Sequence, residues 1–159
     1  MAAPARSAEQ RKSDTLGKLA ERGVDVWVAT AARGEQSDGA AAEPYLVPLS
    51  LAWIDERVVI ALDATSRTAR NLAASGTARL ALGPTRDVVI IDAVVDRVVS
   101  LEDHADQLAV RYVEQADWDP RVAGDGYVLV TLRPVRIQAW REANEIAGRT
   151  LMRDGTWLV

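Results

Sequence analysis

The sequence predicts a single, mainly β domain whose strands form a largely antiparallel, closed or partly closed sheet. Seven or eight segments have the residue pattern of strands, only two or three have the pattern of helices, and most neighbouring strands are separated by short turns. A doubly wound fold would need more crossover helices. The length of 159 residues is typical of one domain. We expect a helical segment at residues 1–23 and the barrel at residues 24–159.

The first helical pattern covers residues 7–22. Ser7-Ala-Glu-Gln10 has the form of a capping box, in which the N-cap and the third helical residue bond each other's backbone N–H groups. Leu16 and Leu19 share one face, and Gly23 suits the C-terminal end.

Extended segments begin after this helix. Residues 24–30 form the first predicted strand and residues 44–53 the second, with a loop at residues 31–43 between them. Pro48 lies inside the second strand and has no N–H to donate to a sheet. We therefore expect it at a sheet edge, at a bulge, or where a ligand replaces the neighbouring strand.

A short helix is predicted between the third and fourth strands. The third strand covers residues 57–63, and the helix runs from about residue 66 to residue 75, where Gly76 ends it. Strands at residues 77–82 and 87–99 follow, and the second of these is long enough to bend.

The third helical pattern follows residue 100. Ser100-Leu-Glu-Asp103 resembles an N-terminal cap, and Trp118-Asp-Pro120 ends the helix. Apolar residues recur at helical spacing between these points. They are Leu101, Ala105, Leu108, Ala109, Tyr112 and Val113.

The C-terminal section is predicted to be extended. Strands at residues 127–132 and 135–140 are separated by Pro134. Residues 151–159 form a hairpin, for which Asp154-Gly155 is a typical turn sequence.

Composition excludes several classes of protein. The chain has no cysteine, which rules out disulfides, thiolate nucleophiles and cysteine-ligated metals, so we expect a cytoplasmic protein. No apolar run approaches the ~18 residues that span a bilayer, and we expect neither a signal peptide nor a membrane anchor. A net charge of −4 argues against nonspecific binding of nucleic acid.

Few residues suit familiar catalytic chemistry. The single histidine, His104, lies among acidic residues and is expected to face solvent, which disfavours a Ser-His-Asp triad. Gly124-Asp-Gly126 lacks the third glycine of a dinucleotide fingerprint. Asp92 and Asp96 alternate with apolar residues, as solvent-facing positions of a strand do. We predict no metal site.

The junction between the third strand and the second helix concentrates groups that bind anions. Thr65 or Ser66 can cap the helix, and the N–H groups of its first turn then favour a phosphate. The hydroxyls of Ser66 and Thr68 can add hydrogen bonds, and the guanidinium groups of Arg67 and Arg70 project from one face. A capped surface helix with two solvated arginines is the alternative, and spacing alone leaves both possibilities open.

Several pieces of the chain, taken in order, resemble a known superfamily. The pieces are residues 26–30, 44–50, 65–72, 134–140 and 148–152. Their order and spacing resemble the pyridoxamine 5′-phosphate oxidase-like split β-barrel superfamily, which has FMN-dependent and coenzyme F420-dependent members. The likeness covers nearly the whole chain from Val24 onward. It implies an antiparallel, Greek-key-like split barrel that forms a homodimer with two cofactor sites at the interface.

The resemblance also implies a set of cofactor-binding residues. The strand along the cofactor ring, with mainly backbone contacts, consists of Val47, Pro48, Leu49 and Ser50. The phosphate is held by Ser66, Arg67 and Thr68, with Arg70 and Asn71 as helpers by position. Trp140 and Arg149 match positions that contact the cofactor from the second subunit, although Trp140 could instead pack in the core.

The chain departs from the vitamin B6 oxidase itself. That enzyme carries an Arg-x-His pair for its substrate where this chain has residues 141–147, which contain no histidine. Thr68 stands where the oxidase has a lysine, and Ala93 where relatives often have glycine. We therefore do not expect oxidation of pyridoxine phosphate.

The leading functional hypothesis is an oxidoreductase that uses FMN, with F420 as the alternative, and acts on a small organic substrate. The cofactor performs the chemistry in such enzymes, so no residue is named catalytic. A longer anionic tail could contact Arg33, Arg57 or Arg86, which could equally be ordinary surface arginines. The competing hypotheses are a carrier or sensor that binds flavin or haem without turnover, and a dimeric structural module with a vestigial site.

Overall fold

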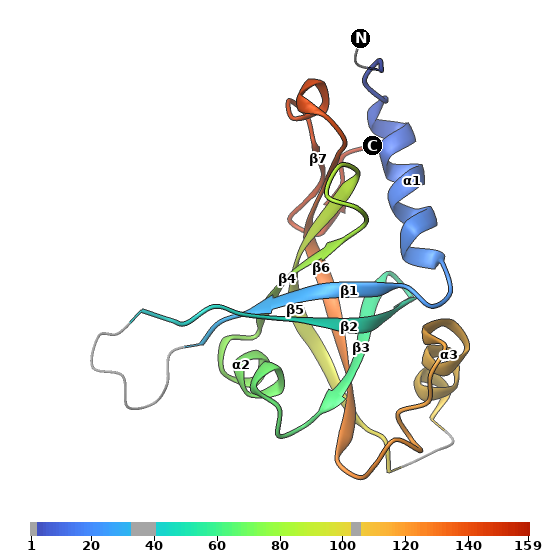
Figure 1. Ribbon diagram of the computed structural model, residues 1–159, viewed down its shortest axis with the longest axis vertical. Coiled ribbons are helices and arrows are strands. Elements are labelled where there is room, and N and C mark those ends of the chain that lie inside the picture. The colour runs from blue at the N-terminus through green and yellow to red at the C-terminus, as the bar shows by residue number, and fades with distance from the viewer. Residues whose placement is uncertain (1–2, 33–40, 103–105) are drawn as a thin grey trace.

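One antiparallel sheet closes on itself to form the body of the protein (Figure 1). The computed structural model describes residues 3–32, 41–102 and 106–159. The strand order is β3-β2-β1-β4-β5-β6-β7-β8, and an additional pairing of β3 with β6 closes the first six strands into a barrel. The predicted closed antiparallel architecture is therefore confirmed.

Eight strands and three α-helices make up the described part of the chain. The strands are β1 (Asp25–Thr30), β2 (Tyr45–Ile54), β3 (Arg57–Asp63), β4 (Thr77–Leu82), β5 (Val88–Ser100), β6 (Tyr127–Trp140), β7 (Thr150–Arg153) and β8 (Thr156–Trp157). The helices are α1 (Ala8–Ala20), α2 (Arg67–Ser75) and α3 (Gln107–Ala116), with a short 3₁₀ helix, η1, at Ala143–Glu145.

The barrel interior is aliphatic and receives side chains from two helices. Alternate residues of β1, including Val26 and Val28, point inward. Leu19 of α1 and Leu72 of α2 join this core. A second apolar cluster lies between α3 and the strands β2 and β3, with Tyr112 as its largest fully buried side chain.

The barrel is split where β2 and β3 separate. Residues 51–54 of β2 pair with residues 57–60 of β3, whereas residues 45–50 pair with β1 alone. Beyond the split, β3 continues along β6 and leads into α2. Residues 45–50 therefore have one open edge, which we call the open edge of β2.

The position of Pro48 follows from this split. The N–H of Leu51 donates to the carbonyl of Val24 at 2.9 Å. Because successive N–H groups of a strand point to opposite sides, the nitrogen of Pro48 points away from β1 toward the open edge. The expectation that Pro48 lies at a sheet edge is confirmed.

The predicted separation of two strands by Pro134 is wrong. β6 runs without interruption through this proline. Asp92 is paired with Arg136 and the adjacent Ala93 with Pro134, so Val135 has no partner on β5. The bulge leaves Val135 out of the ladder, and Pro134 lies directly beside it, where the regular hydrogen bonding of the sheet is already interrupted.

The predicted start of the third helix is also wrong. Ser100 is the last residue of β5, paired with Val128, and α3 begins only at Gln107. The N-cap is Asp106, whose carboxylate accepts from the N–H of Leu108 at 2.8 Å. Strand pairing therefore prevails over the local capping pattern, and residues 103–105 lie outside the described residues.

Other local predictions hold. Ser7 caps α1 with both bonds of a capping box, Ser66 caps α2, and Gly76 ends α2 in a left-handed conformation. Asp154 and Gly155 both have positive φ and form the turn between β7 and β8. Among the described residues, no helix is both long and apolar enough to cross a membrane.

Candidate functional site

A row of residues in register crosses the outer surface of the sheet. Its members, each opposite the next on a neighbouring strand, are Pro48, Trp27, Ala81, Ile90, Gln138 and Thr150. Directly opposed residues lie on the same side of a sheet. Trp140 is opposite Val88 and two residues beyond Gln138, so it shares this side, which we call the outer face.

The outer face exposes apolar side chains near the split. Trp27 is 51% exposed and Leu46 is 58% exposed, and Pro48 beside them is exposed as well. Neighbouring exposed apolar side chains of this kind form a candidate interaction surface.

A polar row runs beside the apolar one. Arg79 holds Asp92 through two hydrogen bonds of 2.6 and 3.1 Å, and Arg136 approaches the same carboxylate to 4.0 Å. With its amide oxygen toward the cations, Gln138 accepts from Arg136 at 2.8 Å and from Arg149 at 3.2 Å. The guanidinium of Arg149 lies 5.3 Å from the centre of the Trp140 ring. Trp140 and Arg149 thus form one unit at the end of β6.

A depression of about 420 Å³ opens on the outer face beside the polar row. Small and apolar residues form most of its walls, and Arg79 and Asp92 form its polar side. Ala93, at the bulge, also lines it. The remaining lining residues are Ala29, Thr30, Ala31, Pro44, Thr77, Ala78, Val94 and Val135.

The open edge of β2 presents the backbone of alternate residues. By the same alternation, the C=O group of Pro48 and the N–H and C=O groups of Ser50 lie on the open side, whereas the backbone groups of Val47 and Leu49 point toward β1. The side chains of Val47 and Leu49 pack against the barrel core. Of these four predicted residues, Pro48 and Ser50 are therefore the two that offer backbone groups at the edge.

Tyr112 of α3 fixes the far end of this edge. Its hydroxyl donates to the carbonyl of Ser50 at 3.2 Å and accepts from the indole N–H of Trp118 at 3.2 Å. Burial raises the pKa of Tyr112 to about 12, so the hydroxyl keeps its proton at neutral pH.

The start of α2 carries unbonded donors. The Ser66 hydroxyl accepts from the N–H of Ala69 at 3.2 Å, whereas the N–H groups of Arg67 and Thr68 form no hydrogen bond within the described part of the chain. Both groups belong to the first turn, where N–H groups point out of the helix. Thr65 takes no part in the cap, because its N–H and hydroxyl both donate to Asp63 at 2.7 Å.

Arg67 connects α2 to the beginning of β2. Its guanidinium binds Glu43 at 2.7 Å and lies 4.8 Å from the centre of the Tyr45 ring. Ser66, Arg67 and the open edge of β2, which the sequence assigned to one site, therefore lie close together.

The other predicted residues of α2 differ in burial. Thr68 and Asn71 are buried, and the amide of Asn71 donates to the Thr30 hydroxyl at 3.1 Å. Arg70 is exposed and makes no ion pair with any described residue.

Trp140 and Arg149 do not join this group within one chain. Figure 1 shows the connection from β6 to β7 at the upper end of the molecule, whereas α2 lies beside its lower half. Two of the arginines suggested for a longer anionic tail form ion pairs within the chain: Arg57 binds Asp96 at 3.1 Å and Arg86 binds Glu142 at 2.6 Å. Arg33 and His104 lie outside the described residues.

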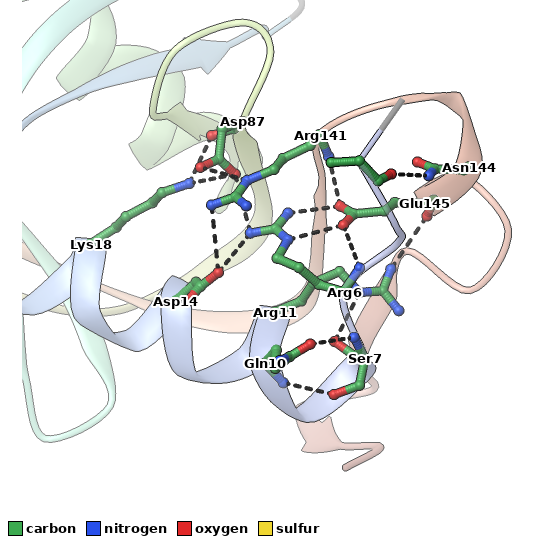
Figure 2. A network of polar contacts seen from close by, with 11 residues as sticks. Arg6, Ser7, Gln10, Arg11, Asp14, Lys18, Asp87, Arg141, Asn144 and Glu145 are labelled. Atoms are coloured by element: carbon green, nitrogen blue, oxygen red, sulfur yellow. Dashed lines mark hydrogen bonds and ion pairs between the residues drawn. The ribbon is translucent and has the colours of Figure 1, made fainter. Parts of the chain in front are cut away.

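A polar network that sequence patterns missed surrounds the connection from β6 to β7 (Figure 2). Arg6, ahead of α1, binds the buried carboxylate of Glu145 through its guanidinium at 2.7 and 3.0 Å. Arg141 turns its guanidinium to Asp87 at 3.2 Å. The charged groups of residues 141–147 are thus bound internally, and no local spacing pairs them with Arg6.

Within the described residues, no group of three or more His, Asp or Glu side chains is placed to hold a metal ion. The polar groups gathered on the outer face and at the open edge include backbone amides, hydroxyls and guanidinium groups, and the carboxylates of Asp92 and Glu43 are each paired with an arginine. Such donors suit an organic anion.

Known structures share this architecture, although no family model and no curated protein matches the sequence. An F420 reductase superposes with a TM-score of 0.57 and 18% identity over 75% of this chain and 92% of its own. A putative pyridoxamine 5′-phosphate oxidase from Listeria innocua superposes with a TM-score of 0.58 and 11% identity. The match covers 82% of this chain and 98% of the Listeria chain. A heme binding protein from Mycobacterium smegmatis superposes with a TM-score of 0.63 and 16% identity. The match covers 98% of this chain but only 60% of the heme binding protein. At these identities the likeness establishes the split β-barrel fold.

Proposed function

We propose that this split β-barrel is an FMN-dependent oxidoreductase that acts on a small, planar organic substrate, with F420 as the alternative cofactor. One observation carries the proposal. The open edge of β2 and the start of α2 meet through Arg67, so that free backbone groups and unbonded N–H donors lie on the two sides of the split.

The start of α2 fits the phosphate end of the cofactor. The N–H groups of Arg67 and Thr68, the Arg67 guanidinium and the Ser66 hydroxyl provide donors within one helical turn. Binding requires Arg67 to exchange Glu43 for the phosphate. The Glu43 side chain is mostly exposed, and exposed ion pairs are weak, so this exchange costs little.

The open edge of β2 fits the polar edge of the ring. Pro48 offers a carbonyl and Ser50 an N–H on that side, and the Tyr112 hydroxyl holds Ser50 through its carbonyl. FMN or F420 would supply the transfer of hydride or electrons, while the protein orients the ring and excludes water. A chain with no cysteine and a single histidine is therefore compatible with an enzyme.

We propose that the active form is a homodimer with the sites at its interface. The exposed apolar residues Trp27, Leu46 and Pro48 supply a surface for a second copy. Two-fold pairing is the usual arrangement of such interfaces. In this dimer the partner subunit's Trp140 and the partner subunit's Arg149 contact the cofactor held at the open edge.

The vitamin B6 reaction is not the one proposed. Arg141 is bound to Asp87 and Glu145 to Arg6, so the stretch that matches the oxidase's substrate motif uses its charges for internal contacts. A substrate that stacks on the ring does not need that motif.

A binding protein without turnover is the second candidate, and the likeness to a heme binding protein favours considering it. The absorption spectrum of the purified protein, followed by mass spectrometry of any released molecule and titration with FMN, F420 and haem, separates the candidates. Saturable binding of FMN or F420, followed by reduction with a nicotinamide donor or reduced F420 and reoxidation by a quinone, supports the enzyme. Binding without reoxidation supports the carrier, and binding of haem alone refutes the proposed oxidoreductase.

A further inference from the structure

We propose that Arg6 is a positioning residue for the cofactor site: by binding Glu145 it holds the connection between β6 and β7 so that Arg149 stays stacked on Trp140. The inference rests on the function proposed above, because it assigns the N-terminal segment a role in that same site.

Arg6 and Glu145 form the most enclosed ion pair of the described chain. The side chain of Glu145 is 3% exposed and that of Arg6 is 10% exposed. The carboxylate accepts from the Arg6 guanidinium at 2.7 and 3.0 Å and from the Arg6 backbone N–H at 2.9 Å. It also accepts from the backbone N–H of Arg141 at 2.8 Å. One carboxylate thus joins the N-terminal segment to both ends of a five-residue turn.

This turn lies between the two residues that it would position. Arg141 directly follows Trp140, and Glu145 lies four residues before Arg149. The carbonyl of Arg149 accepts from the N–H of Ala139 at 3.0 Å, which returns the chain to β6. A displacement of Glu145 would therefore be transmitted to Arg149 through a short, closed loop.

Further contacts surround the Arg6–Glu145 ion pair, which we call the Glu145 clamp. Asp87, in the turn between β4 and β5, binds Arg141 at 3.2 Å, Lys18 at 2.9 Å and Arg6 at 3.3 Å. Arg11 donates to the carbonyl of Glu145 at 3.3 Å. Figure 2 shows these groups converging from α1, the turn before β5 and the connection after β6.

Arg149 needs such support, because its own side-chain contacts are few. It stacks on Trp140 at 5.3 Å and donates to Gln138 at 3.2 Å. A guanidinium held by a ring face and one hydrogen bond keeps its place only if its backbone is fixed.

A double-mutant cycle tests the inference. Arg6→Gln, Glu145→Gln, Arg149→Ala and the double variant Arg6→Gln/Arg149→Ala are titrated with FMN and with F420, under conditions where circular dichroism shows each to be folded. Arg6→Gln should weaken binding roughly three- to tenfold when Arg149 is present, but less than about twofold when Arg149 is alanine. Arg111→Gln is the matched control, because it removes an exposed pair between α3 and Asp55 in the turn after β2.

Amide hydrogen exchange supplies a second measurement that needs no cofactor. Exchange across residues 141–149 should become faster in Arg6→Gln and Glu145→Gln and stay unchanged in Arg111→Gln. Additive effects on affinity, or unchanged exchange, would overturn the positioning role while leaving the proposed function standing. If the wild type binds neither cofactor, the proposed function and this inference both fail.

Discussion

Arg67 and Glu43 form an ion pair of 2.7 Å that joins α2 to the segment before β2. The Arg67 guanidinium also stacks on Tyr45. The backbone N–H groups of Arg67 and Thr68, which have no partner among the described residues, lie in the same first turn of α2. Positive charge and free donors therefore coincide at the point proposed for the cofactor phosphate. In the structure the Arg67 guanidinium binds Glu43, so Glu43 would compete with the phosphate for it.

Replacing Arg67 with alanine should weaken cofactor binding about ten- to a hundredfold, since a hydrogen bond to a charged group contributes roughly 1.5–3 kcal/mol. Titration of wild type and variant with FMN and F420 measures the change. Arg97→Ala is the control, because Arg97 is exposed on β5 and has no ion pair among the described residues. Equal affinities for wild type and Arg67→Ala would refute the phosphate site.

Replacing Glu43 with glutamine should have the opposite effect. Removal of the competing carboxylate frees the Arg67 guanidinium, and an exposed pair contributes at most about 1 kcal/mol, so affinity should rise roughly two- to fivefold. The same titrations report it. Glu114→Gln removes an exposed carboxylate from α3 and corrects for the change in net charge. A weaker or unchanged affinity in Glu43→Gln would show that Glu43 does not compete.

Trp27→Glu should dissociate the proposed homodimer. The side chain is 51% exposed in the single chain and lies in the row that contains Pro48, so a carboxylate there would be buried against a second copy. Light scattering coupled to size exclusion should give a dimer for wild type and a monomer for the variant, with loss of cofactor binding. Val122→Glu is the control, because Val122 is 81% exposed in a loop. A monomeric wild type would exclude the shared site.

The sequence predicted the fold where local patterns and long-range packing agree. The capping box at Ser7 and the cap at Ser66 depend on neighbouring residues only, and both helices begin as expected. Pro134 and Ser100 were misinterpreted because the deciding contacts come from another strand: a bulge accommodates the proline, and pairing with Val128 extends β5 through the serine.

The same difference between local patterns and long-range contacts applies to the candidate site. The helix start identified Ser66 and Arg67, but the burial of Asn71 depends on which face of α2 meets Thr30 of β1. The clamp at Glu145 joins residues 139 positions apart, and no spacing within either segment indicates it.

Acid should remove the contribution of the Glu145 clamp to stability. The hydrogen bonds from Arg6 lower the pKa of Glu145 from its ordinary value of 4.5 to about 2. The folded state therefore favours the carboxylate: its contribution is complete above pH 4.5 and is lost as pH falls toward 2. Glu145→Gln should reduce the free energy of unfolding by about 1–3 kcal/mol at pH 7. Denaturant titrations should show this difference shrinking through that window, and a constant difference would contradict the pKa shift.

Tyr112→Phe tests the support behind the open edge of β2. The loss of the hydroxyl leaves the Ser50 carbonyl and the Trp118 indole N–H without their partner, so the free energy of unfolding should fall by about 1–3 kcal/mol. Burial raises the pKa of Tyr112 from 10.0 to about 12, and this contribution is therefore complete below pH 10 and lost as pH rises toward 12.

A tyrosinate titration followed by absorbance separates Tyr112 from the two other tyrosines of the chain. One group should ionise late in wild type and be missing in Tyr112→Phe. Cofactor affinity should fall as well, because the Ser50 carbonyl loses the bond that holds this residue, and with it the neighbouring N–H, at the open edge. If stability falls while affinity is unchanged, Tyr112 supports the barrel alone and the ring does not use Ser50.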